Sequence, residues 1–256
     1  MIFDLLKDFN QDCAFTDKIN EGPYTESATQ KDHVDQKIIL KVDHKVKGPT
    51  KYHNFVSCII SEYDPMYSSI IPSDKKMYLK QLVTSICSEI EELHESNYDS
   101  YDYNPNIMKV SLIQFGLQVW EKKGNYISSL YYLNDYYKRH FVIVHDMISY
   151  ETTMKNYEKV YLSFVQGRVS LSEVGPDLPV SDLNDLYAMI PLENDIKKST
   201  KQIYKLHLEK ISQYKMEDLK ILAQECNIDL RNDTKAKLKQ ALYDEINIFK
   251  LNMSTQ

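Results

Sequence analysis

The chain of 256 residues has a hydrophobic share of 43%, a charged share of 27% and a formal net charge of −6 at pH 7. A chain of this length forms one large or two small domains, and its apolar runs fall short of the roughly 18 residues that cross a membrane. Its four cysteines form neither a CxxC pair nor a cluster with histidines, and its acidic N-terminus lacks the pattern of a secretory signal. We therefore expect an intracellular protein that holds no metal or cofactor and does not bind a membrane.

Residues 1–36 are predicted to form a short helix followed by a flexible arm. Apolar side chains between Ile2 and Phe9 have helical spacing, and the stretch after them combines few large aliphatic residues with many turn formers. The segment "KIILKVDHKV" then predicts a strand at 37–46. This strand opens the body of the protein, which we place at residues 37–175.

Helical patterns dominate the first part of the body. Asn54 can cap the first helix, Pro65 should end it, and Gly124 should end the third. The tyrosines of "LYYLNDYY" in the fourth helix are expected to pack as a rim of that helix rather than to stack on nucleobases. Apolar residues at helical spacing place the four helices at 54–64, 73–96, 106–124 and 126–139.

Strand patterns follow after Arg139. Residues 140–146 are β-branched and apolar, and "KVYLSFVQGRVSLSE" predicts a hairpin that turns at Gln166 and Gly167. His140 is expected to lie in solvent at the start of the first strand. Helices that lead into a short run of strands are typical of an α+β fold, here with a small mixed or antiparallel sheet.

Residues 176–213 are predicted to connect the body to a C-terminal domain. Gly and Pro residues between 175 and 179 interrupt the regular patterns. Beyond them we expect a helix at 181–190 and a charged connecting helix at 192–212, whose apolar stripe is thin.

Residues 214–250 are predicted to form a small all-α domain. One apolar helical face lies in "MEDLKILAQEC" and another in "DTKAKLKQALYDEI", and "NIDLRN" lies between them as an extended segment. The stretch from Lys197 to Lys239 has eleven Lys/Arg and six Asp/Glu, a difference of +5 that leaves −11 for the rest of the chain. The charge is thus divided between an acidic body and a basic tail.

The tail resembles the SAP motif and its helix-extension-helix relatives. "MEDLKILAQECNI" matches the first helix and the start of the linker of that family, and "DTKAKL" matches the basic start of its second helix. Cys226 and Asn227 stand where the family often has a glycine. The resemblance implies binding to DNA, or sometimes to RNA, chiefly through the phosphate backbone.

Seven residues are candidates for binding nucleic acid, with duplex DNA as the expected partner. At the start of the predicted second helix, backbone N–H groups could meet a phosphate beside Thr234, Lys235 and Lys237. The alternative interpretation is that these lysines form the solvated face of a helical hairpin that contacts protein. The full set of candidates is Lys215, Lys220, Arg231, Thr234, Lys235, Lys237 and Lys239.

The body, over residues 50–173, resembles the ovarian-tumour (OTU) cysteine deubiquitinases, and in particular the divergent OTU-like proteins of large DNA viruses. The likeness is in the order of helices, "GNYISSLYYLNDYYKRHFVIVHD" and the strand pair "KVYLSFVQGRVSL". The family has its cysteine directly after the asparagine that corresponds to Asn54, where this chain has Phe55. Its catalytic histidine follows the last strand, where this chain has Gln166, Gly167 and Arg168. The resemblance therefore implies the fold without the catalytic pair.

A catalytic site could still be assembled from other residues. Cys58 would be the nucleophile, Asp146 would orient the base, and the base would be His53, His140 or His145. Cys58 lies one helical turn inside its predicted helix on the apolar side, a position typical of an inert core cysteine. The pair His145 and Asp146, at a strand end, is more typical of a simple hydrogen bond.

These observations predict a non-enzymatic adaptor of a large DNA virus, in which the body contacts a protein and the SAP-like tail attaches it to DNA. It would act at viral factories in the host cytoplasm or nucleus, or in the virion. Two alternatives stay open: a diverged OTU-like cysteine protease that acts on ubiquitin-like conjugates, and a structural virion component.

Overall fold

In the computed structural model, all the residues that are described lie within the unit Asp43–Gln256. The predicted N-terminal helix, the arm and the strand at 37–46 lie outside the described residues. The residues that the structure describes are 52–91, 97–122, 124–165, 167–172, 178–183, 192–196, 198–232 and 235–254. They form an α+β body followed by a C-terminal helical region, which confirms the predicted fold class.

The predicted helices of the body are present, with shifted ends. The Asn54 side chain accepts a hydrogen bond from Val56 N and so caps the first helix, as predicted. Gly124, however, does not end the third helix, which stops at Gln118. The bounds are α1 (Phe55–Tyr63), α2 (Lys75–Glu91), α3 (Asn97–Ser100), α4 (Val110–Gln118) and α5 (Ile127–Tyr137).

A mixed five-stranded sheet stands against these helices in the order β5-β4-β2-β3-β6. β2 and β4 are parallel, whereas β2–β3 and β4–β5 are antiparallel hairpins. The second hairpin turns at Gly167, with φ +71, as the sequence predicted. The first was not predicted, because it turns at Asp146 and Met147, which adopt positive φ without a glycine. The bounds are β2 (Arg139–His145), β3 (Ile148–Tyr150), β4 (Glu158–Val165), β5 (Arg168–Ser172) and β6 (Val180–Ser181).

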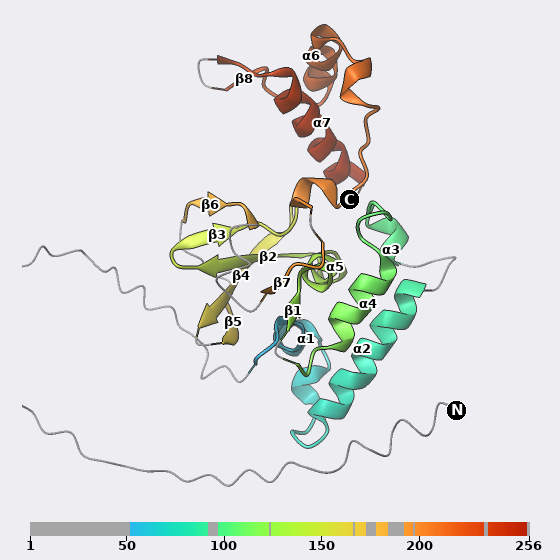
Figure 1. Ribbon diagram of the computed structural model, residues 1–256, viewed down its shortest axis with the longest axis vertical. Coiled ribbons are helices and arrows are strands. Elements are labelled where there is room, and N and C mark those ends of the chain that lie inside the picture. The colour runs from blue at the N-terminus through green and yellow to red at the C-terminus, as the bar shows by residue number, and fades with distance from the viewer. Residues whose placement is uncertain are drawn as a thin grey trace, which may run out of the picture. The chain divides into compact units, whose positions relative to one another are not determined.

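The helices are layered on the sheet (Figure 1). α1 packs on β5 and α5 packs on β2, α4 covers α5, and α2 covers α4. Gly116 of α4 permits the close approach of α5, because a Cβ atom there would lie 3.0 Å from the Cβ atoms of Ser129 and Tyr126. Tyr131 and Tyr132 of α5 are fully buried, so these two tyrosines belong to the core rather than to a rim.

The predicted connecting helix at 192–212 is wrong. The described part of this segment contains β7 (Leu192–Glu193), which pairs with β1 (Asn125–Tyr126), and two short 3₁₀ turns at Thr200–Gln202 and Ile211–Gln213. Ile203 and Tyr204 are buried in the body. The backbone here bonds to another chain segment, since Asn104 N donates to Ile203 O at 2.8 Å and Lys205 N donates to Asp102 O at 2.7 Å. The apolar side chains whose spacing predicted a helix are thus buried by a segment that is largely extended. Most of the helix predicted at 181–190 lies outside the described residues.

The C-terminal region contains α6 (Met216–Glu225), β8 (Arg231–Asn232), β9 (Lys235–Ala236) and α7 (Lys239–Ser254), which we call the C-terminal module. Its small core joins Leu219 and Ala223 of α6 to Leu242 and Ile246 of α7. Leu251, near the end of α7, belongs instead to the core of the body. One helix therefore spans both cores and ties the module to the body.

Candidate functional sites

The extension between α6 and α7 is a turn followed by a hairpin. Asn227 adopts a left-handed conformation, with φ 55, and Ile228 N donates to Ala223 O at 2.8 Å. This is the hydrogen bond of a Schellman motif at the end of a helix. Glycine is the usual residue at the left-handed position of that motif, which is occupied here by Asn227. Asparagine is the best substitute because it tolerates positive φ, so the departure from the family pattern at Cys226 and Asn227 is accommodated.

The β8–β9 hairpin is closed at its base and exposed along its length. Lys237 N donates to Leu230 O at 3.0 Å, and the side chain of Leu230 packs against the core of the module. Above this base, Arg231 lies opposite Ala236 and Asn232 lies opposite Lys235. All four of these residues are exposed.

The seven predicted binding residues have different environments. Lys237 is buried and its Nζ lies 2.6 Å from Glu245 Oε2. Lys220 is half-buried and pairs with Glu217 at 2.8 Å, whereas Lys239 is half-buried with no ion pair among the described residues. Thr234 lies outside the described residues. The exposed cations are Lys215, Arg231 and Lys235.

The expected phosphate site at the start of the second helix is not where the sequence placed it. α7 begins at Lys239, so Lys235 and Lys237 precede the helix. The reason is the hairpin: residues 235 and 236 pair with β8, and the Lys237 amide is bonded to Leu230. Lys235 and Lys237 therefore lie on the hairpin and not on the first turn of the helix.

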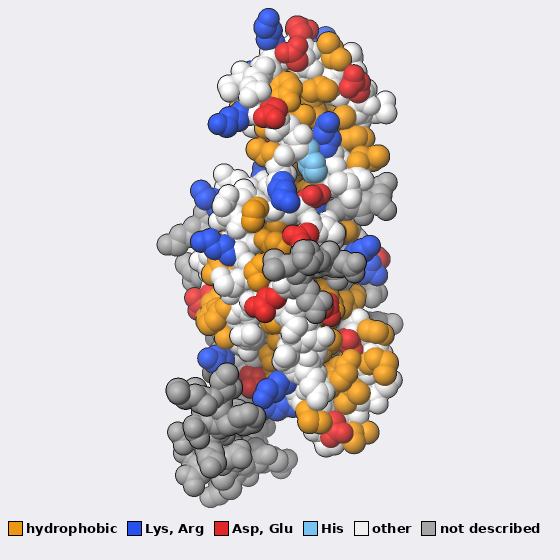
Figure 2. Space-filling model, turned by 90° about the vertical axis from the view of Figure 1, so that its right-hand side faces the viewer, with side chains coloured by type: hydrophobic (Ala, Val, Ile, Leu, Met, Phe, Trp, Pro, Cys, Tyr) orange, Lys and Arg blue, Asp and Glu red, His pale blue; other side chains and the backbone are white. Residues whose placement is uncertain are grey.

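Charges of both signs are interspersed on the module. On the face shown in Figure 2, Lys/Arg side chains at the upper end alternate with Asp/Glu side chains. Several carboxylates lie close to cations, as in the Lys220–Glu217 and Lys201–Asp244 pairs, the latter at 3.8 Å. Attraction of a polyanion by this module depends on a few unpaired cations and not on a broad positive field.

The start of α1 is occupied by two buried amide side chains. Asn54 Nδ2 donates to Gly124 O at 2.6 Å, and Asn125 Oδ1 accepts from Phe55 N at 2.7 Å. The Phe55 side chain is fully buried. The first position of α1 is thus filled by a side chain of the core.

The residues just before α1 lie beside the turn that leads into β5. His53 Nδ1 is 3.3 Å from Gly167 O, and Tyr52 forms a β-bridge with Val169. No histidine occurs among residues 167–172 of β5 and its turn.

Cys58 does not form a catalytic group with His145 and Asp146. Burial, together with Glu62, raises the pKa of Cys58 to about 12, and its sulfur lies 3.8 Å from Val169 O of β5. His145 Nε2 is 3.4 Å from Asp146 Oδ2 at the far end of β2, and β4 separates β2 from β5. Burial thus favours the protonated, unreactive form of the thiol. Among the described residues its sulfur is hydrogen-bonded to Val169 O and not to any of the three histidines considered as the base, His53, His140 and His145.

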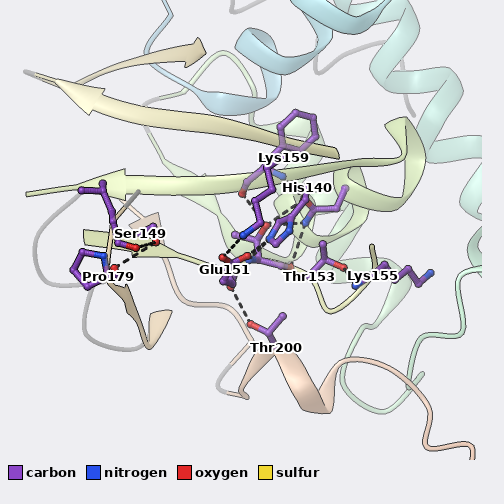
Figure 3. Close-up of polar contacts among 12 residues, drawn as sticks. His140, Ser149, Glu151, Thr153, Lys155, Lys159, Pro179 and Thr200 are labelled. Atoms are coloured by element: carbon purple, nitrogen blue, oxygen red, sulfur yellow. Dashed lines mark hydrogen bonds and ion pairs between the residues drawn. The ribbon is translucent and has the colours of Figure 1, made fainter. Parts of the chain in front are cut away.

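A charged cluster on β2 and β4 escaped prediction. His140 Nε2 is 2.8 Å from Glu151 Oε2, and Lys159 Nζ is 2.9 Å from Glu151 Oε1, with both side chains pointing toward the carboxylate (Figure 3). Burial raises the pKa of Glu151, but the hydrogen bonds from His140 and Lys159 outweigh it and bring the pKa to about 2. His140 is 5% exposed, so the expectation of a solvated histidine is wrong. The β2–β3 hairpin brings Glu151 to His140, and the parallel register His140–Lys159 adds the lysine; the sequence carries no direct signal of either pairing.

A second charged cluster is fully buried at Asp135 of α5. Its carboxylate accepts from Lys155 Nζ at 2.7 Å, from Tyr157 OH at 2.9 Å and from Tyr204 OH at 3.2 Å, and Tyr103 OH donates to it as well. Burial raises the pKa of Asp135, and Lys155 opposes that shift. Since every oxygen has donors, the cluster is a structural joint that fixes the segment leading to the C-terminal module.

Within the described part of the chain, no group of three or more His, Cys, Asp and Glu side chains could bind a metal ion, and no helix could span a membrane. No protein-family model matches the chain, and no curated protein or solved structure proves similar to it.

Proposed function

We propose that this protein is a non-enzymatic adaptor that associates with nucleic acid through its C-terminal module and with a protein partner through its α+β body. The observation that carries the proposal is the β8–β9 hairpin, whose base is fixed by Leu230 and Lys237 while Arg231 and Lys235 remain exposed without ion pairs among the described residues. A fixed base with exposed cationic side chains above it suits contact with a phosphate backbone.

The contact would be modest in strength. Lys215, Arg231, Lys235 and Lys239 give at most about four phosphate contacts, for which the slope of log K against log salt is about −3.6. The module would therefore act by holding an already associated complex on nucleic acid, with affinity gained through a second attachment.

Two observations support an adaptor over an enzyme. Phe55 fills the start of α1, and the pKa of Cys58 is raised by burial to about 12. The adaptor would act at viral DNA, with the body as a protein-binding fold without catalytic activity, a proposal supported by the resemblance of the sequence to divergent OTU-like proteins of large DNA viruses.

The test is fluorescence anisotropy of a labelled duplex titrated with the full chain at several KCl concentrations. We expect weakening with salt at a slope of about −3 to −4. A variant with Lys215, Arg231, Lys235 and Lys239 changed to alanine should lose at least about tenfold in affinity. The matched control changes four exposed lysines of the body: Lys76, Lys80, Lys109 and Lys122.

Two results would contradict the proposal. One is the absence of any anisotropy change up to about 100 µM protein, the weak end of non-specific binding. The other is an equal loss of affinity in the module variant and the body control.

A further inference from the structure

The buried carboxyl group of Asp135 and the amine of Lys155 are positioned to react with each other. Asp135 lies on α5 and Lys155 lies between β3 and β4, so the two residues come from different parts of the body. Lys155 Nζ is 2.7 Å from Asp135 Oδ1, and both side chains are 0% exposed. The same nitrogen donates to Tyr101 O at 3.0 Å. The amine is therefore held against the carboxyl group at a place closed to bulk water.

The surroundings of this pair favour its uncharged form. Two tyrosine rings flank the Lys155 nitrogen, with ring centres at 5.5 Å for Tyr101 and 5.0 Å for Tyr204. Charges are costly at a buried site, and transfer of one proton from the ammonium to the carboxylate leaves a neutral amine beside a neutral acid. Burial raises the pKa of Asp135, which favours the acid form, although Lys155 opposes this shift. The neutral amine is the nucleophilic form of lysine.

Tyrosine hydroxyls supply hydrogen-bond donors to both oxygens of the Asp135 carboxyl group. Oδ2 accepts from Tyr103 OH and from Tyr204 OH, the latter at 3.2 Å. Oδ1 accepts from Tyr157 OH at 2.9 Å. When an amine adds to a carboxyl carbon, negative charge develops on one oxygen, and positioned donors stabilise that charge. Oδ2 has two such donors, and Oδ1 lies beside the groups that can protonate it as it leaves.

We propose that Lys155 and Asp135 form an intramolecular amide bond. Lys155 Nζ bonds to Asp135 Cγ, the bond between Cγ and Oδ1 breaks, and Oδ1 leaves as water with two of the three protons of the ammonium group. The step is a condensation, so nothing is oxidised or reduced and no co-reactant is needed. Well-oriented groups within one molecule reach effective molarities of about 10⁵ M or more, which replaces chemical activation of the acid. Exclusion of water then protects the product from hydrolysis.

The amide bond joins α5 to the loop that holds the end of α7. Asn252 of α7 donates from Nδ2 to Met154 O at 3.2 Å and accepts at Oδ1 from Asn156 N at 2.7 Å. Met154 and Asn156 are the neighbours of Lys155 in the chain, so the bond fixes the backbone on which α7 docks. This inference concerns the body and does not depend on nucleic-acid binding.

Tryptic digestion of the denatured full chain, followed by tandem mass spectrometry, tests the bond. Because an acylated Lys155 is not cleaved, we expect a branched peptide that joins residues 124–138 to residues 140–159. Its mass should be the sum of the two peptides less one water, and its fragments should locate the link at Asp135 and Lys155. Recovery of 124–138 and 140–155 only as separate peptides of full mass overturns the proposal.

A variant without the amine is the first control. Lys155→Met should release residues 124–138 as a separate peptide of full mass, because the nucleophile is gone. If this peptide is still lighter by one water, Asp135 loses water without Lys155, and the proposal is overturned.

A second pair of variants tests the role of the hydroxyl donors. Tyr103→Phe removes one of the two donors to Oδ2 and should slow formation of the branched peptide about a hundredfold, followed over time after cell-free synthesis. Tyr161→Phe, at a half-buried tyrosine of β4, is the matched control and should keep the rate of the unaltered chain. Equal rates in the two variants contradict the role of Oδ2, and the digest of the unaltered chain decides the bond itself even where a variant does not fold.

Discussion

The ammonium nitrogen of Lys237 lies 2.6 Å from Glu245 Oε2, and the Lys237 side chain is 8% exposed. This pair joins the base of the β8–β9 hairpin to the middle of α7. It divides the lysines of the tail into one that holds the fold and others, such as Lys235, that face solvent.

Replacing Lys237 by methionine should therefore change the stability of the protein more than its affinity for nucleic acid. We expect Lys237→Met to lower the free energy of unfolding by about 1–2 kcal/mol, because a charge-assisted hydrogen bond at a buried site is lost. Amide hydrogen exchange at residues 230–237 should accelerate in the same variant. Lys235→Met is the control and should change stability by less than about 0.5 kcal/mol while weakening duplex binding. The reverse order of stabilities would contradict this assignment.

The buried pair of Asp135 and Lys155 gives a second prediction. Lys155→Met leaves a carboxylate without its counter-charge in the core, which costs about 3–5 kcal/mol of folding free energy. The double variant Asp135→Asn, Lys155→Met removes both charges and should be more stable than Lys155→Met alone. Urea unfolding followed by the fluorescence of Trp120, the one tryptophan, measures both. Strict additivity of the two single changes would show that the pair does not interact.

The Glu151 cluster predicts a pH dependence of stability. The folded pKa of Glu151, about 2, lies below the ordinary glutamate pKa of 4.5, so the contacts of the ionised carboxylate stabilise the protein above about pH 4.5. This contribution, about 1–3 kcal/mol, is lost as pH falls from about 4.5 to about 2. Glu151→Gln should lower stability at pH 7 and flatten the slope in that window. Glu158→Gln, at a side chain that is 72% exposed, should keep the slope.

The cysteines should differ in reactivity in the native protein. With pKa values raised by burial to about 12 and about 11, Cys58 and Cys87 are almost entirely protonated at pH 8. Iodoacetamide should label the half-buried Cys226 and reach the other two only after denaturation, as read by peptide mass spectrometry. A ubiquitin-aldehyde thiol probe should label no cysteine of the described region. Rapid native labelling of Cys58 would revive the protease alternative.

Local sequence signals predicted the elements that depend on neighbouring residues. The Asn54 cap of α1, the apolar stripe of α2 and the Gly167 turn each involve contacts within a few positions along the chain. Helix periodicity likewise placed α6, because Leu219 and Ala223 recur on one face and are buried together. In such cases backbone geometry and side-chain spacing suffice.

Only the tertiary structure decided the features that depend on distant partners. The stretch at 192–212 has helical spacing, yet pairing with residues 102–104 and burial of Ile203 and Tyr204 make it extended. The sequence does not distinguish Lys237 from the neighbouring lysines. In the structure, Lys237 forms a buried ion pair with Glu245 and is therefore not accessible to a ligand. His140 and Glu151 meet only because β2 and β3 form a hairpin that the sequence does not mark.

The sequence by itself determined an α+β body, a two-helix tail and the absence of a cysteine at the start of α1, since these follow from residue types and short-range spacing. The tertiary structure alone decided which charged groups are buried in pairs and which are free for a ligand. The physical reason is that two opposite charges pair only when they lie within a few ångströms of each other. The fold brings together charged residues that are far apart in the sequence.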